Sequence, residues 1–252
     1  FGVPAVDQFL AAPPRCPAAA LSGVASWACG GAPMPVAWRE RAAARVVVIR
    51  QGLGLTETSP TVFLTDEDHA LRKAGSVGKA CLHTEIKVVD DGGAAVGVDE
   101  IGELWVRGPN VTPGYWERPE ANAESFTDGW LHTGDAARVD ADGYVYIVDR
   151  WKDMFISGGE NVYPAEVEQV LFRHPNVLDV AVIGVPDDRW QEVGMAVVVP
   201  RDPAGFDGDE LLAFCDGKLA RYKIPKAVTV VEVLPRNAAG KVLKRELREA
   251  MG

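Results

Sequence analysis

The pattern of apolar and polar positions divides the chain into three stretches. Residues 1–74 pass from a short apolar segment through a glycine-proline turn to a helical pattern over 36–45 and a β-branched run at 46–49. This order is typical of the last α/β units of a parallel sheet, where strands alternate with covering helices. The stretch supplies too few strands for a complete doubly wound domain, so we expect the tail of a larger α/β domain.

Residues 75–149 have a different pattern. Short apolar and β-branched runs at 85–89, 101–107 and 144–148 are separated by Asp-Gly turns, which predicts antiparallel strands. We expect a small barrel-like β subdomain here, with residues 128–135 forming a tight loop between strands.

Residues 150–252 mix helical and strand patterns, which predicts a small α+β domain. Pro164 suits the first position of a helix, and acidic residues follow it in the first turn. Asp207 and Glu210 have capping-box spacing ahead of a second helix, which carries Gly217 in its interior. The expected elements are a helix over 164–172, a helix through 211–219, a helix carrying Leu243 and Leu247, and strands at 177–185, 195–199 and 228–233.

Composition narrows the class of protein. The 252 residues carry a net charge of −10, and this negative charge does not favour binding to nucleic acid. The sequence contains no run of about 18 apolar residues, so no transmembrane helix is predicted. The chain begins with Phe1 and shows no signal peptide, so we expect a fragment or a processed product. The cysteines and histidines are scattered, which disfavours structural zinc and disulfides and fits a reducing cytosol; they are Cys16, Cys29, Cys81, Cys215, His69, His83, His132 and His174.

Two polar segments are candidates for ligand chemistry. Thr56 and Glu57 follow a glycine-rich segment at the end of a predicted strand, and a hydroxyl beside a carboxylate suits a phosphate oxygen and Mg²⁺. Asp135 follows Gly134, and a carboxylate there can accept both donors of a ribose diol. The alternatives are a glycine-rich turn with a polar cap and an ordinary turn aspartate.

Residues 143–168 combine a strand, a charged break, a glycine loop and a helix start. Ser157, Gly158 and Gly159 can bring bare backbone close to a ligand, because glycine has no Cβ. The alternative is a plain loop between two elements. Basic residues cluster after Lys218 and again after Arg236, and each cluster is either a solvated helix face or a contact for phosphates.

Five motifs occur in an order that resembles the AMP-forming acyl-CoA synthetases, a family that includes firefly luciferase and the peptide-synthetase adenylation domains. The resemblance covers essentially the whole chain, and the segment 157–164 is more similar to fatty-acyl and aryl-CoA ligases than to acetyl-CoA synthetases. The motifs are residues 51–57, residues 102–108 with 114–116, residues 130–135, residues 143–168 and residues 235–241.

The resemblance implies a two-step reaction. A carboxylic acid, fatty or aryl, reacts with ATP and Mg²⁺ to give acyl-AMP, and the thiol of coenzyme A then displaces AMP. Thr56 would contact phosphate, Glu57 would bind Mg²⁺, Asp135 would hold the ribose with Arg150 beside it, and Lys241 would bridge the carboxylate and phosphate oxygens. Gly31, Ala32, Leu53 and Gly54 match segments that pass the nucleotide, and Leu53 replaces the usual adenine-stacking tyrosine.

The resemblance also implies domain organisation. Residues 1–149 would be the C-terminal portion of the large domain, with α/β units over 1–74 and the β subdomain over 75–149, and residues 150–252 would be a small mobile domain. Lys152 matches the hinge about which that domain rotates between the two steps. Ser157, Gly158, Gly159, Trp190 and Tyr222 would contact coenzyme A in the second state, although both aromatics are equally compatible with core or rim positions.

The family's upstream phosphate loop has no counterpart here, so the chain resembles the C-terminal half of a synthetase. Two other functions stay open. One is an adenylation domain that loads a carrier protein, and the other is a non-catalytic fragment that binds nucleotide. A Ser-His-Asp hydrolase is disfavoured because no Gly-x-Ser-x-Gly elbow occurs.

Overall fold

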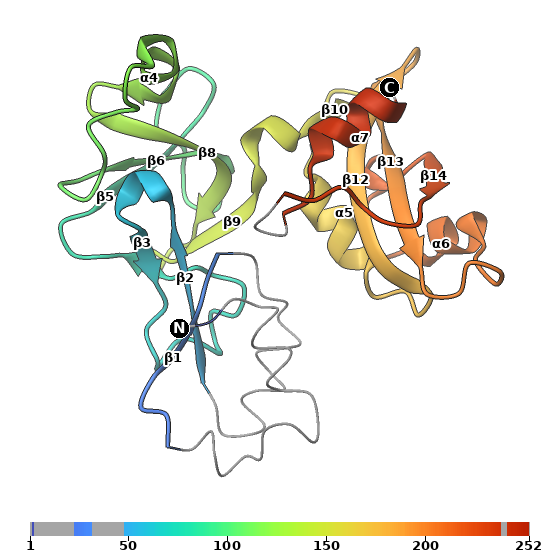
Figure 1. The fold of residues 1–252 in the computed structure, drawn as a ribbon, viewed down its shortest axis with the longest axis horizontal. Coiled ribbons are helices and arrows are strands. Elements are labelled where there is room, and N and C mark those ends of the chain that lie inside the picture. The colour runs from blue at the N-terminus through green and yellow to red at the C-terminus, as the bar shows by residue number, and fades with distance from the viewer. Residues whose placement is uncertain (1, 3–22, 32–47, 238–240, 252) are drawn as a thin grey trace. The chain divides into compact units, whose positions relative to one another are not determined.

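The computed structural model describes residues 2, 23–31, 48–237 and 241–251, and the helix expected over 36–45 lies outside them. The chain divides into two compact units, residues 1–147 and residues 148–252 (Figure 1). They are called the first and second units below, and each is described by itself. Among the described residues, none of the helices has the length and apolar character needed to cross a membrane.

The first unit begins with a parallel strand pair, as the α/β pattern predicted. Strand β1 (Trp27–Cys29) runs beside β2 (Ile49–Gly54), and β3 (Thr61–Leu64) and β4 (Lys79–Ala80) continue the sheet in antiparallel fashion. The strand extends beyond the run expected at 46–49, and the alternative of a glycine-rich turn does not hold for Gly52 and Gly54, because both lie inside β2. A Cβ on Gly54 would overlap the Pro60 carbonyl oxygen, so glycine is what allows β3 to pack this closely.

A second sheet of the first unit is antiparallel and curled, which confirms the barrel-like β subdomain. Its strands share one core with the first sheet, in which Phe63 of β3 packs with Leu104 and Val145. A short helix, α4 (Pro119–Ser125), contacts β7. The strands are β5 (Glu85–Val89), β6 (Gly102–Arg107), β7 (Phe126–Thr127), β8 (Trp130–Val139) and β9 (Val145–Arg150).

Two boundaries in this sheet differ from the expectations. Residues 130–135 form part of the continuous strand β8, so a loop there was wrong. Strand β9 extends through Asp149 and Arg150, which the sequence pattern placed in a charged break. A charged residue fits the strand end because the Asp149 carboxylate accepts the N–H groups of Arg150 and Ala165, each at 2.7 Å.

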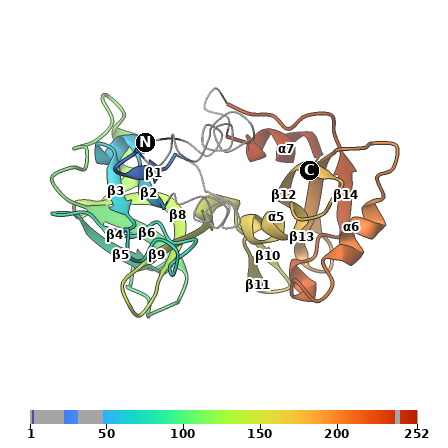
Figure 2. The ribbon, with the colours of Figure 1, turned by 90° about the horizontal axis from the view of Figure 1, so that it is seen from below.

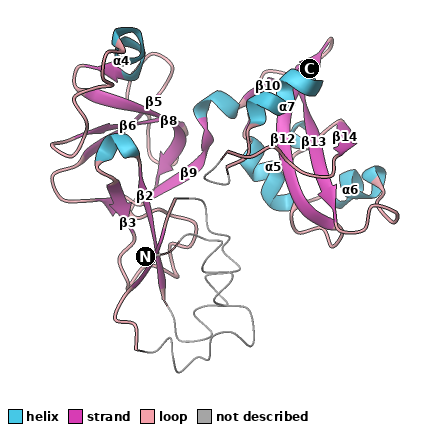
Figure 3. Ribbon diagram, in the orientation of Figure 1, coloured by secondary structure: helices cyan, strands magenta, loops and turns pink. Residues whose placement is uncertain are grey.

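The second unit is built on a sheet whose central strand is β13, as Figures 2 and 3 show. β13 pairs with β12 in antiparallel and with β14 in parallel fashion, and its start meets β10 at Ser157. The elements are η2 (Trp151–Asp153), β10 (Phe155–Ser157), β11 (Glu160–Val162), α5 (Pro164–Leu171), β12 (Val177–Asp187), β13 (Gln191–Pro200), α6 (Gly208–Phe214), η3 (Arg221–Lys223), β14 (Ala227–Val230) and α7 (Lys244–Met251).

Alternation along β12 places helices on both faces of this sheet. Val180 and Val182 pack in the cluster that contains Leu171 of α5 and Leu211 of α6. Their neighbours, such as Ile183, pack in the cluster that contains Leu247 of α7. The second unit therefore has α5 and α6 on one face and α7 on the other.

The helix predicted through 211–219 is shorter than expected. Asp207 caps it by accepting the N–H groups of Asp209 and Glu210, which confirms the predicted start. It ends at Phe214, because Gly217 adopts φ +71° and stops the helical path. Strand β14 also ends earlier than predicted, at Val230.

Candidate functional site

The turn after β2 presents Thr56 and Glu57 on a 3-10 turn, η1 (Thr56–Thr58). Buried Thr58 holds this turn, because its hydroxyl donates to the Leu55 and Pro60 carbonyl oxygens at 3.0 and 2.5 Å. Thr56 is exposed and Glu57 is half-buried. The turn is stabilised by Thr58, so the side chains of Thr56 and Glu57 remain available for the predicted contacts with phosphate and magnesium.

Tyr115 is a partner of Glu57 that the sequence analysis did not single out. Its hydroxyl donates to Glu57 Oε1 at 2.8 Å, and the Thr112 N–H donates to the Glu57 carbonyl at 2.7 Å. Burial, reinforced by the Glu57 carboxylate, raises the pKa of Tyr115. Asn122 fixes this tyrosine through both backbone groups, at 2.6 and 2.9 Å. The signal in the sequence was the motif at 114–116, whose tyrosine had no assigned partner.

Asp135 lies in a bulge of strand β8. Three residues, 133–135, stand opposite Leu104 of β6, and Gly134 adopts φ +67°. Buried Thr133 stabilises the bulge, since its hydroxyl donates to the Leu104 carbonyl at 2.7 Å and accepts the Asp135 N–H at 3.1 Å. A bulge re-aims the side chain that follows it, and here that side chain is a 4 % exposed carboxylate.

Glu103 supports the same bulge from β6. Its two oxygens accept the Gly134 N–H at 3.1 Å and the Trp105 indole N–H at 2.7 Å. The Trp105 ring stacks on His132, with centroids 3.8 Å apart. The site around Asp135 therefore has a rigid support that comes from alternate residues of β6 and β8.

The glycine segment of the second unit is the turn of a hairpin between β10 and β11. Gly158 and Gly159 adopt φ values of +61° and +88°, a backbone conformation that residues with a Cβ rarely adopt. The Gly158 N–H donates to the Trp190 carbonyl at 2.9 Å, and a Cβ on Gly158 would lie 2.7 Å from the Trp190 ring. The structure thus brings together Ser157, Gly158 and Trp190, three of the residues predicted to contact coenzyme A.

Tyr222 lies in η3, the 3-10 turn that contacts β11 of the same hairpin. It is 38 % exposed, as is Trp190 at 41 %, so neither aromatic is a core residue. Lys223, beside Tyr222, pairs with Glu166 of α5 at 2.7 Å. Trp190 therefore borders the glycine turn directly, and Tyr222 belongs to a turn that contacts the second strand of the hairpin.

Lys241 lies ahead of α7, and its backbone is hydrogen-bonded to that of Asn237. Asn237 holds it on both sides, since the Asn237 N–H donates to the Lys241 carbonyl and the Lys241 N–H donates to Asn237 Oδ1, each at 2.9 Å. Arg236 and Val242, the next residues outward, form an isolated β-bridge. The exposed Lys241 side chain is thus attached to a fixed backbone.

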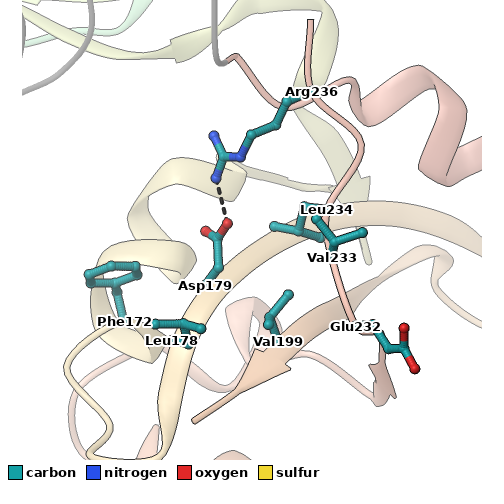
Figure 4. A pocket seen from close by; sticks show the side chains of 8 residues that line it. All are labelled: Phe172, Leu178, Asp179, Val199, Glu232, Val233, Leu234 and Arg236. Carbon is teal, nitrogen blue, oxygen red and sulfur yellow. Dashed lines mark hydrogen bonds and ion pairs between the residues drawn. The ribbon is translucent and has the colours of Figure 1, made fainter. Parts of the chain in front are cut away.

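The remaining predicted residues are distributed over both units. Gly31 adopts φ +82°, Leu53 packs partly against the first unit's core, and Ala32 lies outside the described residues. Arg150 ends β9, and exposed Lys152 lies in η2. Figure 4 shows a pocket of the second unit, edged by the Asp179–Arg236 ion pair at 2.5 Å. None of the predicted site residues lines that pocket.

Comparison with known proteins decides the family. Residues 1–116 match the profile of AMP-binding enzymes, and residues 166–241 match the profile of the AMP-binding enzyme C-terminal domain. A feruloyl-CoA synthase from an Amycolatopsis species is 50 % identical over all 252 residues, which are 51 % of that protein. The chain belongs to the AMP-binding enzyme family.

Solved structures agree with this assignment. The o-succinylbenzoate CoA synthetase of Bacillus subtilis, in complex with its acyl-adenylate intermediate, superposes with a TM-score of 0.90 at 38 % identity, over 98 % of this chain and 50 % of that one. The same synthetase in complex with ATP and magnesium gives a TM-score of 0.86 at 36 % identity, over 97 % and 50 %. The chain spans about half the length of the relatives it matches and corresponds to their C-terminal half.

The AMP-binding family implies a magnesium ion, and one carboxylate of the first unit fits it. Glu57 is half-buried, and Tyr115 occupies one of its oxygens. Within the described ranges, no group of three or more acidic, histidine or cysteine side chains could hold a metal by itself. Magnesium is commonly bound by one or two carboxylates, with phosphates and water as the other ligands. The residues present therefore fit an ion that arrives with a nucleotide, and do not form a closed protein cage.

Proposed function

We propose that this chain is the C-terminal half of an AMP-forming acid–thiol ligase, which activates a carboxylic acid with ATP and transfers the acyl group to coenzyme A. The 50 % identity to a feruloyl-CoA synthase over the whole chain carries the proposal. Because the chain spans about half of that relative, the complete reaction is proposed for the full-length enzyme. We favour an aryl acid as the substrate, with a fatty acid as the other predicted class. A cytoplasmic location stays a prediction.

The first step is the attack of a carboxylate oxygen on the α-phosphorus of ATP, which breaks the bond to pyrophosphate. In our proposal Asp135 accepts the ribose hydroxyls, with Arg150 beside it, and Thr56 contacts phosphate. The buried bulge supports this role, because it holds the Asp135 backbone before any ligand arrives. Magnesium, when bound at Glu57, would supply positive charge to the phosphates.

Lys241 is proposed to lie between the carboxylate and the α-phosphate during this step. Two anions repel each other, and an ammonium group between them offsets that repulsion most strongly where charge accumulates. The Asn237 contacts support the role, because they fix the backbone from which the Lys241 ammonium group is presented.

For the second step we propose that the second unit rotates about Lys152 and presents the glycine hairpin to coenzyme A. Gly158 and Gly159 allow the pantetheine arm close to the backbone, with Trp190 and Tyr222 as walls. The contact of Gly158 with Trp190, and that of η3 with β11, support this assignment. An adenylation domain that loads a carrier protein is the second candidate, since a carrier brings the same pantetheine thiol.

The test joins this chain to the N-terminal half of the Amycolatopsis feruloyl-CoA synthase and measures ferulate-dependent ATP–pyrophosphate exchange. We expect exchange, with a loss of about 100-fold or more in the Lys241→Ala variant. Arg245→Ala is the matched control, because it removes a cation from the same region at an 84 % exposed position. Equal exchange by both variants would refute the assignment of Lys241. Transfer to a carrier protein but not to coenzyme A would favour the second candidate.

A further inference from the structure

The segment around Lys152 is held by two carboxylates of the second unit. Asp149 Oδ2 accepts the Ala165 N–H at 2.7 Å, in the first turn of α5. Asp153 Oδ1 accepts a guanidinium N–H of Arg248 in α7 at 2.8 Å. Both contacts lie within the second unit, so they are defined without reference to the first.

The two contacts differ in their position along the chain. Asp149 precedes Lys152 and Ala165 follows it, whereas Asp153 and Arg248 both follow Lys152. A change of backbone torsion at Lys152 therefore moves Ala165 relative to Asp149. The same change does not alter the distance between Asp153 and Arg248, because both residues follow Lys152 and move together. Because N–H···O hydrogen bonds weaken beyond about 3.2 Å, the first contact cannot survive a large rotation at Lys152.

We propose that the Asp149–Ala165 hydrogen bond is a latch that closes across the hinge and must open each time the second unit rotates about Lys152. The inference rests on the two-step function proposed above. Asp149 is thus a positioning residue for the reaction, since it acts on the population of the two domain arrangements and touches no substrate.

Helix α5 depends on this latch for its first turn. The initial N–H groups of a helix have no partner within the helix, and the N-cap residue Tyr163 supplies no side-chain acceptor. Asp149 fills that role from 16 residues upstream. The boundary between the compact units lies between Ile147 and Val148, within strand β9, so Asp149 is counted with the second unit although it precedes Lys152.

Amide hydrogen exchange at Ala165 tests whether the latch exists. In the 252-residue chain we expect Ala165 to exchange at least about 10-fold faster in Asp149→Ala, because a hydrogen bond to a charged acceptor is lost. Asp149→Asn keeps an oxygen acceptor and should give a smaller increase. Asp153→Ala is the matched control, since it removes an ion pair that does not span Lys152. An unchanged Ala165 rate in Asp149→Ala would overturn the proposal.

The full-length synthetase joined as above tests whether the latch opens. Ala165 exchange is compared between a stable acyl-AMP analogue and AMP with coenzyme A, while a pair of labels reports the distance between the units. We expect the distance to change and Ala165 protection to differ at least about 10-fold between the two states. A changed distance with equal protection would place the pivot before Asp149 and refute the latch. An unchanged distance would refute the rotation itself, and with it the latch.

Kinetics separate the latch from a purely structural role. Asp149→Ala should change the ratio of the adenylation rate to the thioester-forming rate by roughly 10- to 100-fold, because only one arrangement loses a contact. A general folding defect would lower both rates by the same factor, and that result would overturn the proposal. Asp153→Ala should leave the ratio within about 2-fold of the wild type.

Discussion

Replacing Lys244 by methionine should destabilise the second unit more than any other charge removal on α7. The Lys244 ammonium lies 2.7 Å from Glu168 Oε1, and the two side chains are 12 % and 22 % exposed. The same oxygen accepts the Val182 N–H at 2.8 Å, so Glu168 joins α5, β12 and α7. Methionine keeps the length of the side chain but leaves a mostly buried carboxylate without its cation.

The magnitude follows from the degree of burial. Removing one partner of a fully buried ion pair costs about 3–5 kcal/mol, and residual exposure reduces this, so we expect a loss of about 2–3 kcal/mol at pH 7. Arg245→Met is the control on the same helix. Arg245 pairs with Glu249 at 3.5 Å with both side chains more than half exposed, so its loss should cost less than about 0.5 kcal/mol.

The pH dependence gives the prediction a second, independent feature. Burial raises the pKa of Glu168 above its ordinary value of 4.5, and Lys244 partly opposes that rise. Without Lys244 the folded-state pKa rises further. The folded state then holds a proton that the unfolded state has lost, so stability falls as pH rises from about 4.5 through the folded pKa. The cost of Lys244→Met should therefore be largest at neutral pH and shrink as pH falls toward 4.5.

The assay is urea unfolding of the 252-residue chain at pH 5 and pH 8, followed by hydrogen exchange at the core amides of β12 and β13. A cost for Lys244→Met that equals the cost for Arg245→Met would refute the reasoning about burial. A cost that is the same at both pH values would refute the role of the Glu168 charge.

Three further predictions concern the first unit's site and one helix cap. Gly54→Ala should destabilise the first unit by about 2 kcal/mol or more in thermal unfolding, because its Cβ overlaps the Pro60 carbonyl oxygen. Thr133→Val should raise the KM for ATP of the joined synthetase about 10-fold or more with a smaller change in kcat, because it releases the bulge that holds Asp135. Asp207→Ala should cost about 1 kcal/mol in urea unfolding, through loss of the α6 cap.

Each of these variants has a control and a contradicting result. Gly23→Ala is the control for Gly54→Ala, since a Cβ at residue 23 meets nothing within 4 Å. Equal unfolding temperatures for the two variants would contradict the packing argument. Thr127→Val is the control for Thr133→Val. A fall in kcat with an unchanged KM for ATP in Thr133→Val would contradict the role of the bulge in holding Asp135. Asp209→Ala serves for the cap, and a loss as large as that of Asp207→Ala would show that capping is not the cause.

The sequence was sufficient where local pattern and tertiary structure agree. Alternating apolar residues placed β5 at its observed bounds, and the spacing of Asp207 and Glu210 placed the start of α6. The Asp-Gly turns separated the strands of the curled sheet, because turn residues require that backbone in any context. The first-turn position of Pro164 likewise fixed the start of α5.

Other features could not be predicted, because they depend on partners far along the chain. Gly52 and Gly54 have the composition of a turn, and only the backbone of β3 makes them a strand. The partnership of Tyr115 with Glu57 spans 58 residues, and no local periodicity encodes it. Residues 133–135 resemble a loop for the same reason, since the bulge exists only against Leu104 of β6.

The contacts described above divide into those that build a site and those that let it change. Thr58 and Thr133 bond to backbone groups of the first unit, and Asn237 bonds to Lys241 on the same side of Lys152, so each holds its neighbouring functional residue whatever the torsion at Lys152. Asp149 differs, because its partner Ala165 lies on the other side of Lys152. A rigid site needs contacts of the first kind, and a reaction with two arrangements needs at least one contact of the second kind that is weak enough to open. One hydrogen bond to a charged carboxylate has about that strength. The buried Lys244–Glu168 pair lies entirely after Lys152, so the rotation leaves it intact and the latch is the contact expected to break.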